Sequence, residues 1–232
     1  MSAGPAPPAP SPAELRGWLG DIDVYLFDQL LKGRLTPAMR VLDAGCGRGR
    51  NLAYLLRAGF EVCAVDQAAG AVEEVRRLAA ELAPALPAES FRVEAVERTS
   101  FADASFDAVL SSAVLHFARD REHFDAMLAG TWRVLRPGGL FFARLATDIG
   151  IEDRVRPRGG RRFLLPDGTE RFLADEAMLA EAADRLGGDP VEPLRTVNVG
   201  GLRCMTTWCL RRRPASGGTD SAARETRGGR GA

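Results

Sequence analysis

Five apolar runs of strand length alternate with helix-length segments through the middle of the chain. The runs lie at about residues 39–45, 61–66, 91–96, 106–112 and 140–146. Short, continuously apolar runs of this kind are typical of parallel strands that are buried on both faces of a sheet. The segments between them, such as "AVEEVRRLAAEL", repeat apolar residues at helical spacing. The alternation predicts an α/β fold with a doubly wound, mostly parallel sheet and helices on both faces.

Further elements flank this central region. Apolar side chains at helical spacing over residues 14–35 predict one amphipathic N-terminal helix. After residue 146 the segment "RRFLLPDGTERFL" predicts a hairpin around "PDG", and a helix is expected near 174–187. Two closing strands at about 192–199 and 203–213 bring the predicted sheet to seven strands.

The two ends of the chain differ in composition from its middle. Residues 1–13 are rich in proline and alanine, and residues 214–232 are rich in glycine, serine, threonine and arginine. Segments without apolar periodicity cannot bury enough surface to become ordered, so both are expected to be disordered tails. One domain is therefore predicted over residues 14–213.

Charge and cysteine content limit the possible partners. The 31 basic and 31 acidic side chains cancel, which gives the chain no electrostatic signature of a nucleic-acid or membrane binder. The four cysteines form no CxxC pair and follow no signal peptide, which favours a cytoplasmic location and no metal site. We expect a monomer or homodimer without nucleic-acid or membrane partners.

The loop after the first apolar run, "VLDAGCGRGRN", is the first candidate for a ligand site. Its glycines end the first strand, where a doubly wound sheet places its ligand crevice. A pyrophosphate-binding loop would read GxGxxG, whereas this loop reads GxGxG and continues with Arg50. Asp43 would repel a diphosphate and would suit a ligand that carries an ammonium or sulfonium group.

Asp66 closes the second strand, seventeen residues after Gly49. A carboxylate at this place can accept hydrogen bonds from both ribose hydroxyls. That role fits an adenosyl group and a nicotinamide dinucleotide equally well. The alternative is that Asp66 caps a helix that begins at Gln67.

Four motifs together resemble those of class I S-adenosylmethionine-dependent methyltransferases, in the same order. They are "VLDAGCGRGRN", "VCAVDQ", "SFDAVLSSAVLHF" and "RVLRPGGLFFARL", and they span residues 41–146. The flanks "GDIDVYLFDQLL" and "LRCMTTWCLRRR" resemble a small bacterial subgroup near the tellurite-resistance-type methyltransferases. The resemblance implies a Rossmann-like sheet, S-adenosylmethionine as cofactor, and methyl transfer to a small-molecule acceptor by in-line displacement.

The resemblance also assigns cofactor-binding residues. The residues that it implies around methionine, ribose and adenine are Asp43, Gly45, Cys46, Gly47, Asp66 and Gln67. The family usually has an acidic or polar residue at the end of the third strand, where it meets the adenine amino group. This chain has Ala95 there, so either Glu94 replaces it in a shifted register or backbone groups near Val96 bind the base.

Further candidates for cofactor contacts lie in the leading helix, at the end of the glycine loop and on the fourth strand. In similar enzymes an N-terminal helix covers the cofactor, which would bring Tyr25 and Gln29 into the site; alternatively Gln29 belongs to a solvated polar rim. Asn51 either caps the following helix or contacts the cofactor. Ser111, on the fourth strand, is another candidate contact.

One histidine and an arginine run are candidates for the acceptor side. His116 follows the fourth strand and is the candidate general base, with a packed histidine in the pocket floor as the alternative. His123 is expected on the surface. The arginines within 154–162 lie in a predicted acceptor-side insertion, 147–175, where they either grip an anionic acceptor or form a solvated loop.

Two other functions remain open from the sequence. A nicotinamide-dependent oxidoreductase is disfavoured by the glycine spacing and by Asp43. A non-catalytic S-adenosylmethionine-binding regulatory module gains some support from Ala95, because the expected acidic residue is missing there.

Overall fold

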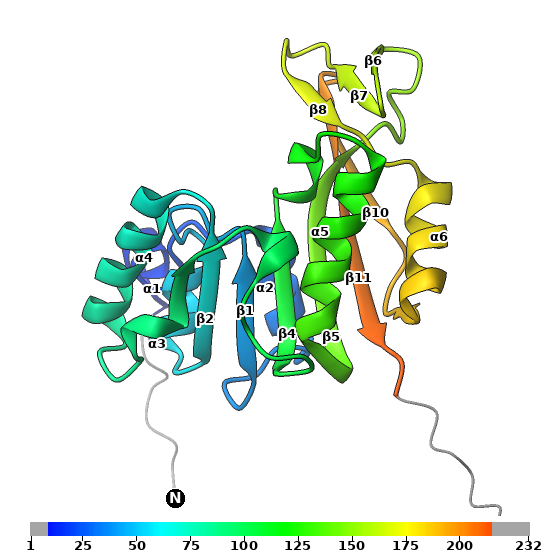
Figure 1. Ribbon diagram of the computed structural model, residues 1–232. Helices are drawn as coiled ribbons and strands as arrows, with labels where there is room; N and C mark the ends of the chain where they lie inside the picture. Colours follow the sequence, from blue (N-terminus) through cyan, green and yellow to red (C-terminus); the bar gives the residue numbers. More distant parts are fainter. Residues whose placement is uncertain (1–8, 215–232) are drawn as a thin grey trace, which may run out of the picture.

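An eight-stranded sheet forms the centre of residues 9–214, the part of the chain that this computed structural model describes (Figure 1). The strand order is β10-β11-β5-β4-β1-β2-β3, and β9 pairs with β11. The strands are β1 (Arg40–Ala44), β2 (Glu61–Asp66), β3 (Phe91–Val93), β4 (Phe106–Ser112), β5 (Leu135–Thr147), β9 (Gly188–Pro190), β10 (Arg195–Val199) and β11 (Arg203–Arg212).

The pairing directions confirm the predicted mostly parallel α/β sheet. Strands β1 to β5 pair in parallel, and β11 runs antiparallel to β5, β9 and β10. The five central strands and both closing strands lie where the apolar runs predict them. The sheet has eight strands and not seven, because the short strand β9 adds to the β11 edge.

Helices cover both faces of the sheet, as expected for a Rossmann-like fold. They are α3 (Leu52–Arg57), α4 (Ala69–Leu82), α5 (Arg121–Val134) and α6 (Glu176–Leu186). Successive strand residues point to opposite faces. On β1, Val41 packs in the cluster that contains Leu55 of α3 and Val75 of α4, while Leu42 packs with Phe124 of α5 and Leu179 of α6.

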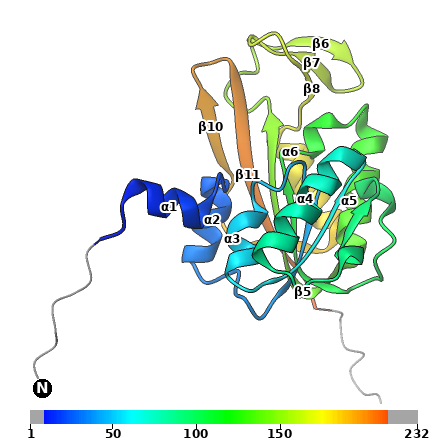
Figure 2. The ribbon, with the colours of Figure 1, turned by 90° about the vertical axis from the view of Figure 1, so that its left-hand side faces the viewer.

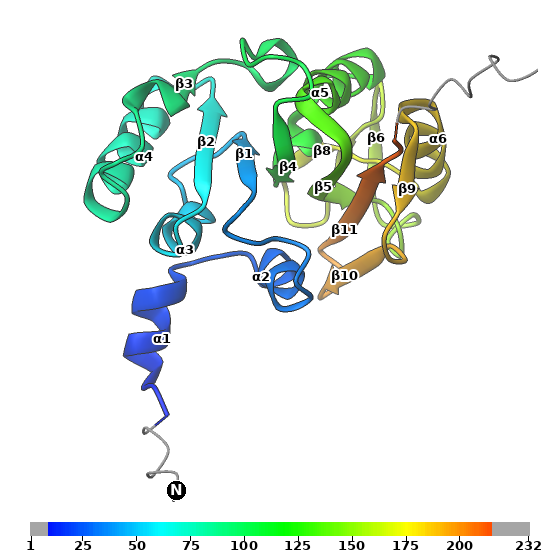
Figure 3. The ribbon, with the colours of Figure 1, turned by 90° about the horizontal axis from the view of Figure 1, so that it is seen from below.

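The N-terminal segment forms two helices, which corrects the prediction of one continuous helix. Helix α1 (Pro12–Leu19) ends at Gly20, whose φ of +62° is outside the helical range, and Asp23 caps the start of α2 (Val24–Leu31). Apolar periodicity continues across this break, so it did not reveal the turn. No α1 residue is buried, and Figure 3 shows α1 projecting from the body while α2 lies against it.

The segment after β5 forms a separate three-stranded sheet. Its strands are β6 (Arg156–Gly159), β7 (Arg162–Leu164) and β8 (Glu170–Phe172). The β7–β8 hairpin confirms the turn predicted around "PDG", and β6 is an additional strand. Figure 2 shows this small sheet beyond one end of the central sheet, near the start of α5.

The expectations for the tails, 1–13 and 214–232, fall mostly on residues outside the described range; the described part of the first includes the beginning of α1. Within residues 9–214, no helix has the length and apolar character needed to cross a membrane.

Candidate functional site

A pocket of about 770 Å³ lies at the carboxyl ends of β1, β2 and β4. Pockets of this size are typical of small-molecule and cofactor sites. It brings together eight of the residues that the sequence predicts. They are Gly45, Cys46, Gly47, Asn51, Asp66, Gln67, Ala95 and Val96.

The loop after β1 leaves its backbone open to the pocket. Gly45 has a φ of +84°, and a Cβ at this position would lie 2.5 Å from Val114 Cγ2. Gly47 has a φ of +50°, and a Cβ there would have no atom within 4 Å. Gly45 therefore permits a tight turn against β4's end, and Gly47 leaves space for a ligand to approach the main chain.

Asp43 provides a buried carboxylate below this loop. It is 1% exposed, and neither carboxylate oxygen has a hydrogen-bond partner within residues 9–214. The pKa of Asp43 is raised to about 7, mainly by burial; the charge of Arg50 opposes this shift and the charge of Asp66 adds to it. An unpartnered buried carboxylate is costly, so the site fits a ligand that supplies a cationic or N–H donor group. Asp43 does not itself line the pocket.

Asp66 connects the end of β2 to the glycine loop. One carboxylate oxygen accepts the N–H of Gly47 at 2.9 Å, and the other accepts the N–H of Ala68 at 2.9 Å. Helix α4 has Ala68 at its N-cap position without a side-chain cap, so Asp66 does not take the alternative N-cap role. Each carboxylate oxygen can accept a further hydrogen bond, which leaves Asp66 able to bind ribose hydroxyls.

Cys46 lines the pocket as a thiol. Burial, followed by the charges of Asp43 and Asp66, raises its pKa well above the ordinary value. A thiolate is the nucleophilic form of cysteine, so Cys46 is a packing residue of the pocket at neutral pH and not a nucleophile.

Two glutamates follow β3, Glu94 and Glu97, and only Glu97 lines the pocket. Glu94 accepts the backbone N–H of Ser100 at 2.8 Å and also its hydroxyl, and it does not line the pocket. A single 3₁₀ turn, η2 (Val96–Arg98), follows β3. Ala95, Val96 and Glu97 of this segment line the pocket.

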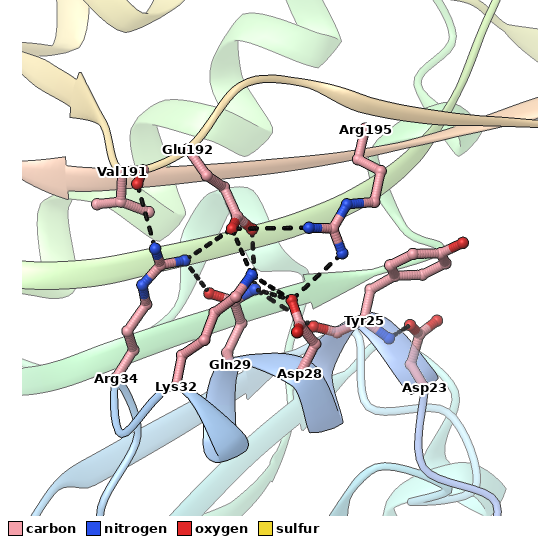
Figure 4. Close-up of polar contacts among 9 residues, drawn as sticks. All are labelled: Asp23, Tyr25, Asp28, Gln29, Lys32, Arg34, Val191, Glu192 and Arg195. Atoms are coloured by element: carbon pink, nitrogen blue, oxygen red, sulfur yellow. Dashed lines mark hydrogen bonds and ion pairs between the residues drawn. The ribbon is translucent and has the colours of Figure 1, made fainter.

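Gln29 and Tyr25, which the resemblance brought toward the cofactor, lie outside the pocket lining. Gln29 is fully buried, donates to Glu192 at 2.9 Å and accepts from Arg34 at 2.7 Å. Figure 4 shows this network joining α2 to the segment between β9 and β10. Tyr25 lies beneath the guanidinium of Arg195, with 5.7 Å from the guanidinium carbon to the ring centroid. These contacts anchor α2 to the sheet.

His116 and Ser111 also lie outside the pocket lining. His116 is 6% exposed, and its Nδ1 accepts the backbone N–H of Ala146 at 3.2 Å. Burial, with smaller contributions from Arg171 and Arg144, lowers the pKa of His116 to about 4. These contacts favour the packed alternative over a general base. Ser111 is fully buried, and its hydroxyl has no partner among the described residues.

An ionic cluster closes the pocket on the α2 side. The Asp23 carboxylate lies 3.2 Å from Arg50 and 2.9 Å from Arg144. Arg50 also donates to the Ser112 hydroxyl at 3.1 Å. Asn51 accepts the backbone N–H of Asp23 at 3.0 Å and makes no side-chain cap of α3. The cluster therefore links the glycine loop to α2 and β5.

Several pocket residues were not predicted from the sequence. They include Asp21, Arg50, Glu97, Ser112, Val114, Phe117, Arg119, His123 and Met127. His123 corrects the expectation of a surface residue, because its side chain is only 13% exposed. The available signal was Asp120, whose side chain accepts the N–H of His123 and starts α5 at the carboxyl end of the sheet.

Two of the five arginines in the run form ion pairs within the described residues. Arg161 pairs with Asp148 at 3.2 Å and Asp175 at 3.0 Å, and Arg162 pairs with Glu170 at 2.7 Å. The other three, Arg154, Arg156 and Arg158, make no ion pair in the described part of the chain. Two members of the run therefore stabilise the small sheet and its connection to α6.

Comparison with known proteins identifies the family. A model of the methyltransferase domain matches residues 42–143. The ubiquinone biosynthesis O-methyltransferase of Methylocella silvestris is 37% identical over 186 residues, which cover 72% of this chain and 70% of that protein. Across three curated relatives the chain spans between 48% and 70% of their length.

Solved structures show the same fold. An S-adenosylmethionine-dependent methyltransferase from Methanosarcina mazei has a TM-score of 0.64 at 20% identity and covers 80% of this chain and 98% of its own. The 1,6-didemethyltoxoflavin-N1-methyltransferase of Burkholderia thailandensis, solved with its acceptor and S-adenosylhomocysteine, has a TM-score of 0.58 at 23% identity and covers 91% and 94%. This chain therefore belongs to the class I S-adenosylmethionine-dependent methyltransferases and uses S-adenosylmethionine as its cofactor.

Proposed function

We propose that the chain transfers the methyl group of S-adenosylmethionine to a small molecule bound in the same pocket. The observation that carries this proposal is the extent of the pocket, which continues from the glycine loop past Val114 to Phe117 and Met127. A volume of about 770 Å³ suits a cofactor and a small acceptor together more than a protein segment or a nucleic acid. The Burkholderia enzyme is named for the methylation of a small molecule, 1,6-didemethyltoxoflavin, and the Methylocella relative is named for ubiquinone biosynthesis.

In this proposal the glycine loop and the strand ends hold the cofactor. Asp66 accepts hydrogen bonds from the ribose, and Gly45 and Gly47 let the methionine part lie close to the main chain. Asp43 supplies the negative charge that complements an ammonium group. The support for Asp43 is its pair of unpartnered carboxylate oxygens within residues 9–214.

The acceptor lies against Val114, Phe117 and Met127 in this proposal. When bound, the cofactor supplies a methyl group that its sulfonium already activates. The protein then has to align the acceptor and exclude water, and Val114, Phe117 and Met127 provide apolar surface for both. His116 lies outside the pocket lining, and its Nδ1 already accepts the N–H of Ala146, so this proposal does not use it as a base. An acceptor that arrives deprotonated, such as a thiolate, needs no base.

An acceptor screen tests the function. Purified protein is incubated with S-adenosylmethionine and panels of phenols, carboxylic acids, heterocyclic amines and thiols, and products are analysed by mass spectrometry for the gain of one methyl group. Asp66→Ala serves as the cofactor-deficient control. Formation of a methylated product by the native chain and its loss in the control support the proposal. Tight binding of S-adenosylmethionine without methylation of any panel member contradicts it and favours a binding module.

A further inference from the structure

Three arginines line the pocket, and only two of them have a carboxylate partner among residues 9–214. Arg48 pairs with Glu74 at 3.3 Å, and Arg50 pairs with Asp23 at 3.2 Å. Arg119 is exposed and makes no ion pair in this range. A guanidinium is charged at every physiological pH and carries a fork of N–H donors. Arg119 therefore offers the pocket a positive charge that no described side chain neutralises.

A second arginine contacts the same part of the pocket. The guanidinium carbon of Arg171, on β8, lies 5.1 Å from the ring centroid of Phe117, which lines the pocket. Arg171 donates to the carbonyl oxygen of Glu170 at 2.8 Å and makes no ion pair within the described part of the chain. Its charge is, after burial, the second cause of the lowered pKa of His116. We refer to Arg119 and Arg171, together with Phe117, as the arginine rim.

The small sheet is joined to the segment that carries Arg119. Arg162 of β7 donates to the carbonyl oxygen of Ala118 at 3.2 Å, directly before Arg119 in the chain. Strand β8 pairs with β7, with Arg171 opposite Phe163. The two arginines of the rim therefore come from segments far apart in the sequence that the fold holds side by side.

The acidic side chains near the arginine rim are engaged with other groups. Glu170 pairs with Arg162 at 2.7 Å, and Asp120 accepts the backbone N–H of His123 at 2.8 Å. Glu97, which also lines the pocket, lies 3.5 Å from His123 Nε2. Because no carboxylate within residues 9–214 pairs with the arginine rim, its positive charges are open to a ligand.

We propose that the methyl acceptor carries a carboxylate or phosphate group and that the arginine rim binds this group. Phe117 belongs both to the rim and to the apolar surface proposed for the acceptor, so an acceptor that rests its apolar part on Val114, Phe117 and Met127 lies beside the guanidinium groups. Arginine binds carboxylates and phosphates through paired N–H donors. This inference rests on the proposed methyl transfer and names the chemical class of its acceptor.

Binding to the protein saturated with S-adenosylhomocysteine tests the arginine rim without requiring methyl transfer. Calorimetry compares 4-hydroxybenzoate with 4-hydroxybenzamide, and phenyl phosphate with phenol. We expect at least one of the two anions to bind about tenfold or more tightly than its neutral counterpart, the range for hydrogen bonds to a charged group. The anion with the larger preference distinguishes a carboxylate from a phosphate site. If neither anion exceeds its neutral counterpart, the proposal is overturned.

Variants of the rim test whether these two arginines bind the anion. Arg119→Gln and Arg171→Gln should each weaken binding of the preferred anion by about tenfold and leave its neutral counterpart unchanged. Arg156→Gln is the matched control, because Arg156 is an exposed arginine of the same small sheet that lies outside the pocket lining. Unchanged anion affinity in either rim variant, or an equal loss in the control, overturns the proposal. The affinity for S-adenosylhomocysteine and the melting temperature show that each variant is folded.

The acceptor screen separates this inference from the proposed function. Methylated products that are all derived from neutral acceptors would overturn the anionic acceptor and leave methyl transfer in place. Selective binding of an anion at the rim, without methylation of any panel member, would contradict methyl transfer and leave the anion site standing. We expect the methylated acceptors to be anionic, and conversion of their carboxylate to an amide should lower kcat/KM by about tenfold or more.

Discussion

The carboxylate of Asp23 lies 2.9 Å from the guanidinium of Arg144, although 121 residues separate them in the chain. Arg50, from the glycine loop, binds the same carboxylate at 3.2 Å. The Asp23 side chain is only 1% exposed, so the two arginines provide its charge neutralisation. This arrangement fastens the start of α2 over the carboxyl ends of β4 and β5 and so closes the pocket on one side.

Replacing Asp23 should therefore destabilise the fold. Asp23→Asn leaves the largely buried Arg144 without its counter-charge, and removing one partner of such a pair typically costs about 3 kcal/mol or more of unfolding free energy. Asp23→Ala should cost about 1 kcal/mol more, because the side chain also caps α2 by accepting the N–H of Tyr25. Urea unfolding followed by circular dichroism measures both. Asp21→Asn, two residues earlier and exposed, is the control and should change the unfolding free energy by less than about 0.5 kcal/mol.

Asp66→Ala should weaken binding of S-adenosylmethionine by one to two orders of magnitude. The magnitude follows from the loss of hydrogen bonds to a charged group, each contributing roughly 1.5 to 3 kcal/mol. Calorimetric titration gives the dissociation constant, and the melting temperature checks that the variant remains folded. A dissociation constant equal to that of the native chain would remove Asp66 from the ribose site.

Local sequence predicted the part of the site that lies within single motifs. The glycine loop and Asp66 follow buried strands directly, so strand order alone places them together. Glu97 and His123 could not be paired in this way, because they meet only through the packing of α5 on η2, which depends on Gly130. Near Ala95 the sequence left open Glu94 or backbone groups near Val96; Glu94 accepts a hydrogen bond from Ser100 and does not line the pocket.

The N-terminal segment shows a second limit of prediction from sequence. The resemblance implied that an N-terminal helix brings Tyr25 and Gln29 to the cofactor. In the structure α2 faces the segment between β9 and β10, where Gln29 donates a hydrogen bond to Glu192. The burial of Gln29 and the ion pairs of Glu192 with Lys32 and Arg34 decide that orientation. Glu192 lies far along the chain from Lys32 and Arg34, so local sequence does not reveal these pairs. Burial by itself would raise the pKa of Glu192. The hydrogen bonds from Lys32, Arg34 and Gln29 outweigh this effect and lower the pKa to about 2.

Asp43 should make the stability of the ligand-free protein decrease as the pH rises. Burial raises the pKa of Asp43 in the folded state to about 7 from its ordinary value of 3.8. Between pH 4 and 7 the folded state retains a proton that the unfolded state has lost, so the unfolding free energy falls with rising pH, by about 1.36 kcal/mol for each pH unit at most. Asp43→Asn should abolish this decrease. Urea unfolding of both proteins at several pH values measures it; parallel pH profiles would show that Asp43 is ionised throughout.

Binding of a cationic cofactor group should depend on the same titration. If Asp43 complements an ammonium group, affinity for S-adenosylmethionine should increase as the carboxylate ionises near pH 7, where its pKa lies. Asp43→Asn should lose that increase and should bind more weakly above pH 7. Calorimetry at pH 6 and pH 8 tests both statements. A native affinity that is constant over this range would show that the ligand does not use the charge of Asp43.

His116→Asn should have little effect on turnover once an acceptor is known. The side chain is 6% exposed, its Nδ1 is occupied by the N–H of Ala146, and burial lowers its pKa to about 4, so it is a poor proton acceptor at neutral pH. Asparagine can accept the same backbone N–H through its carbonyl oxygen. The variant should instead alter acid stability, because between about pH 6.5 and 4 the unfolded histidine binds a proton that the folded one does not, and this loss of stability on acidification should be absent from the variant. Turnover and unfolding are measured over the same pH range. A general base would cost ~10²-fold or more in turnover when removed, and a pH inflection in the native turnover that disappears only in His116→Asn would assign that role to His116.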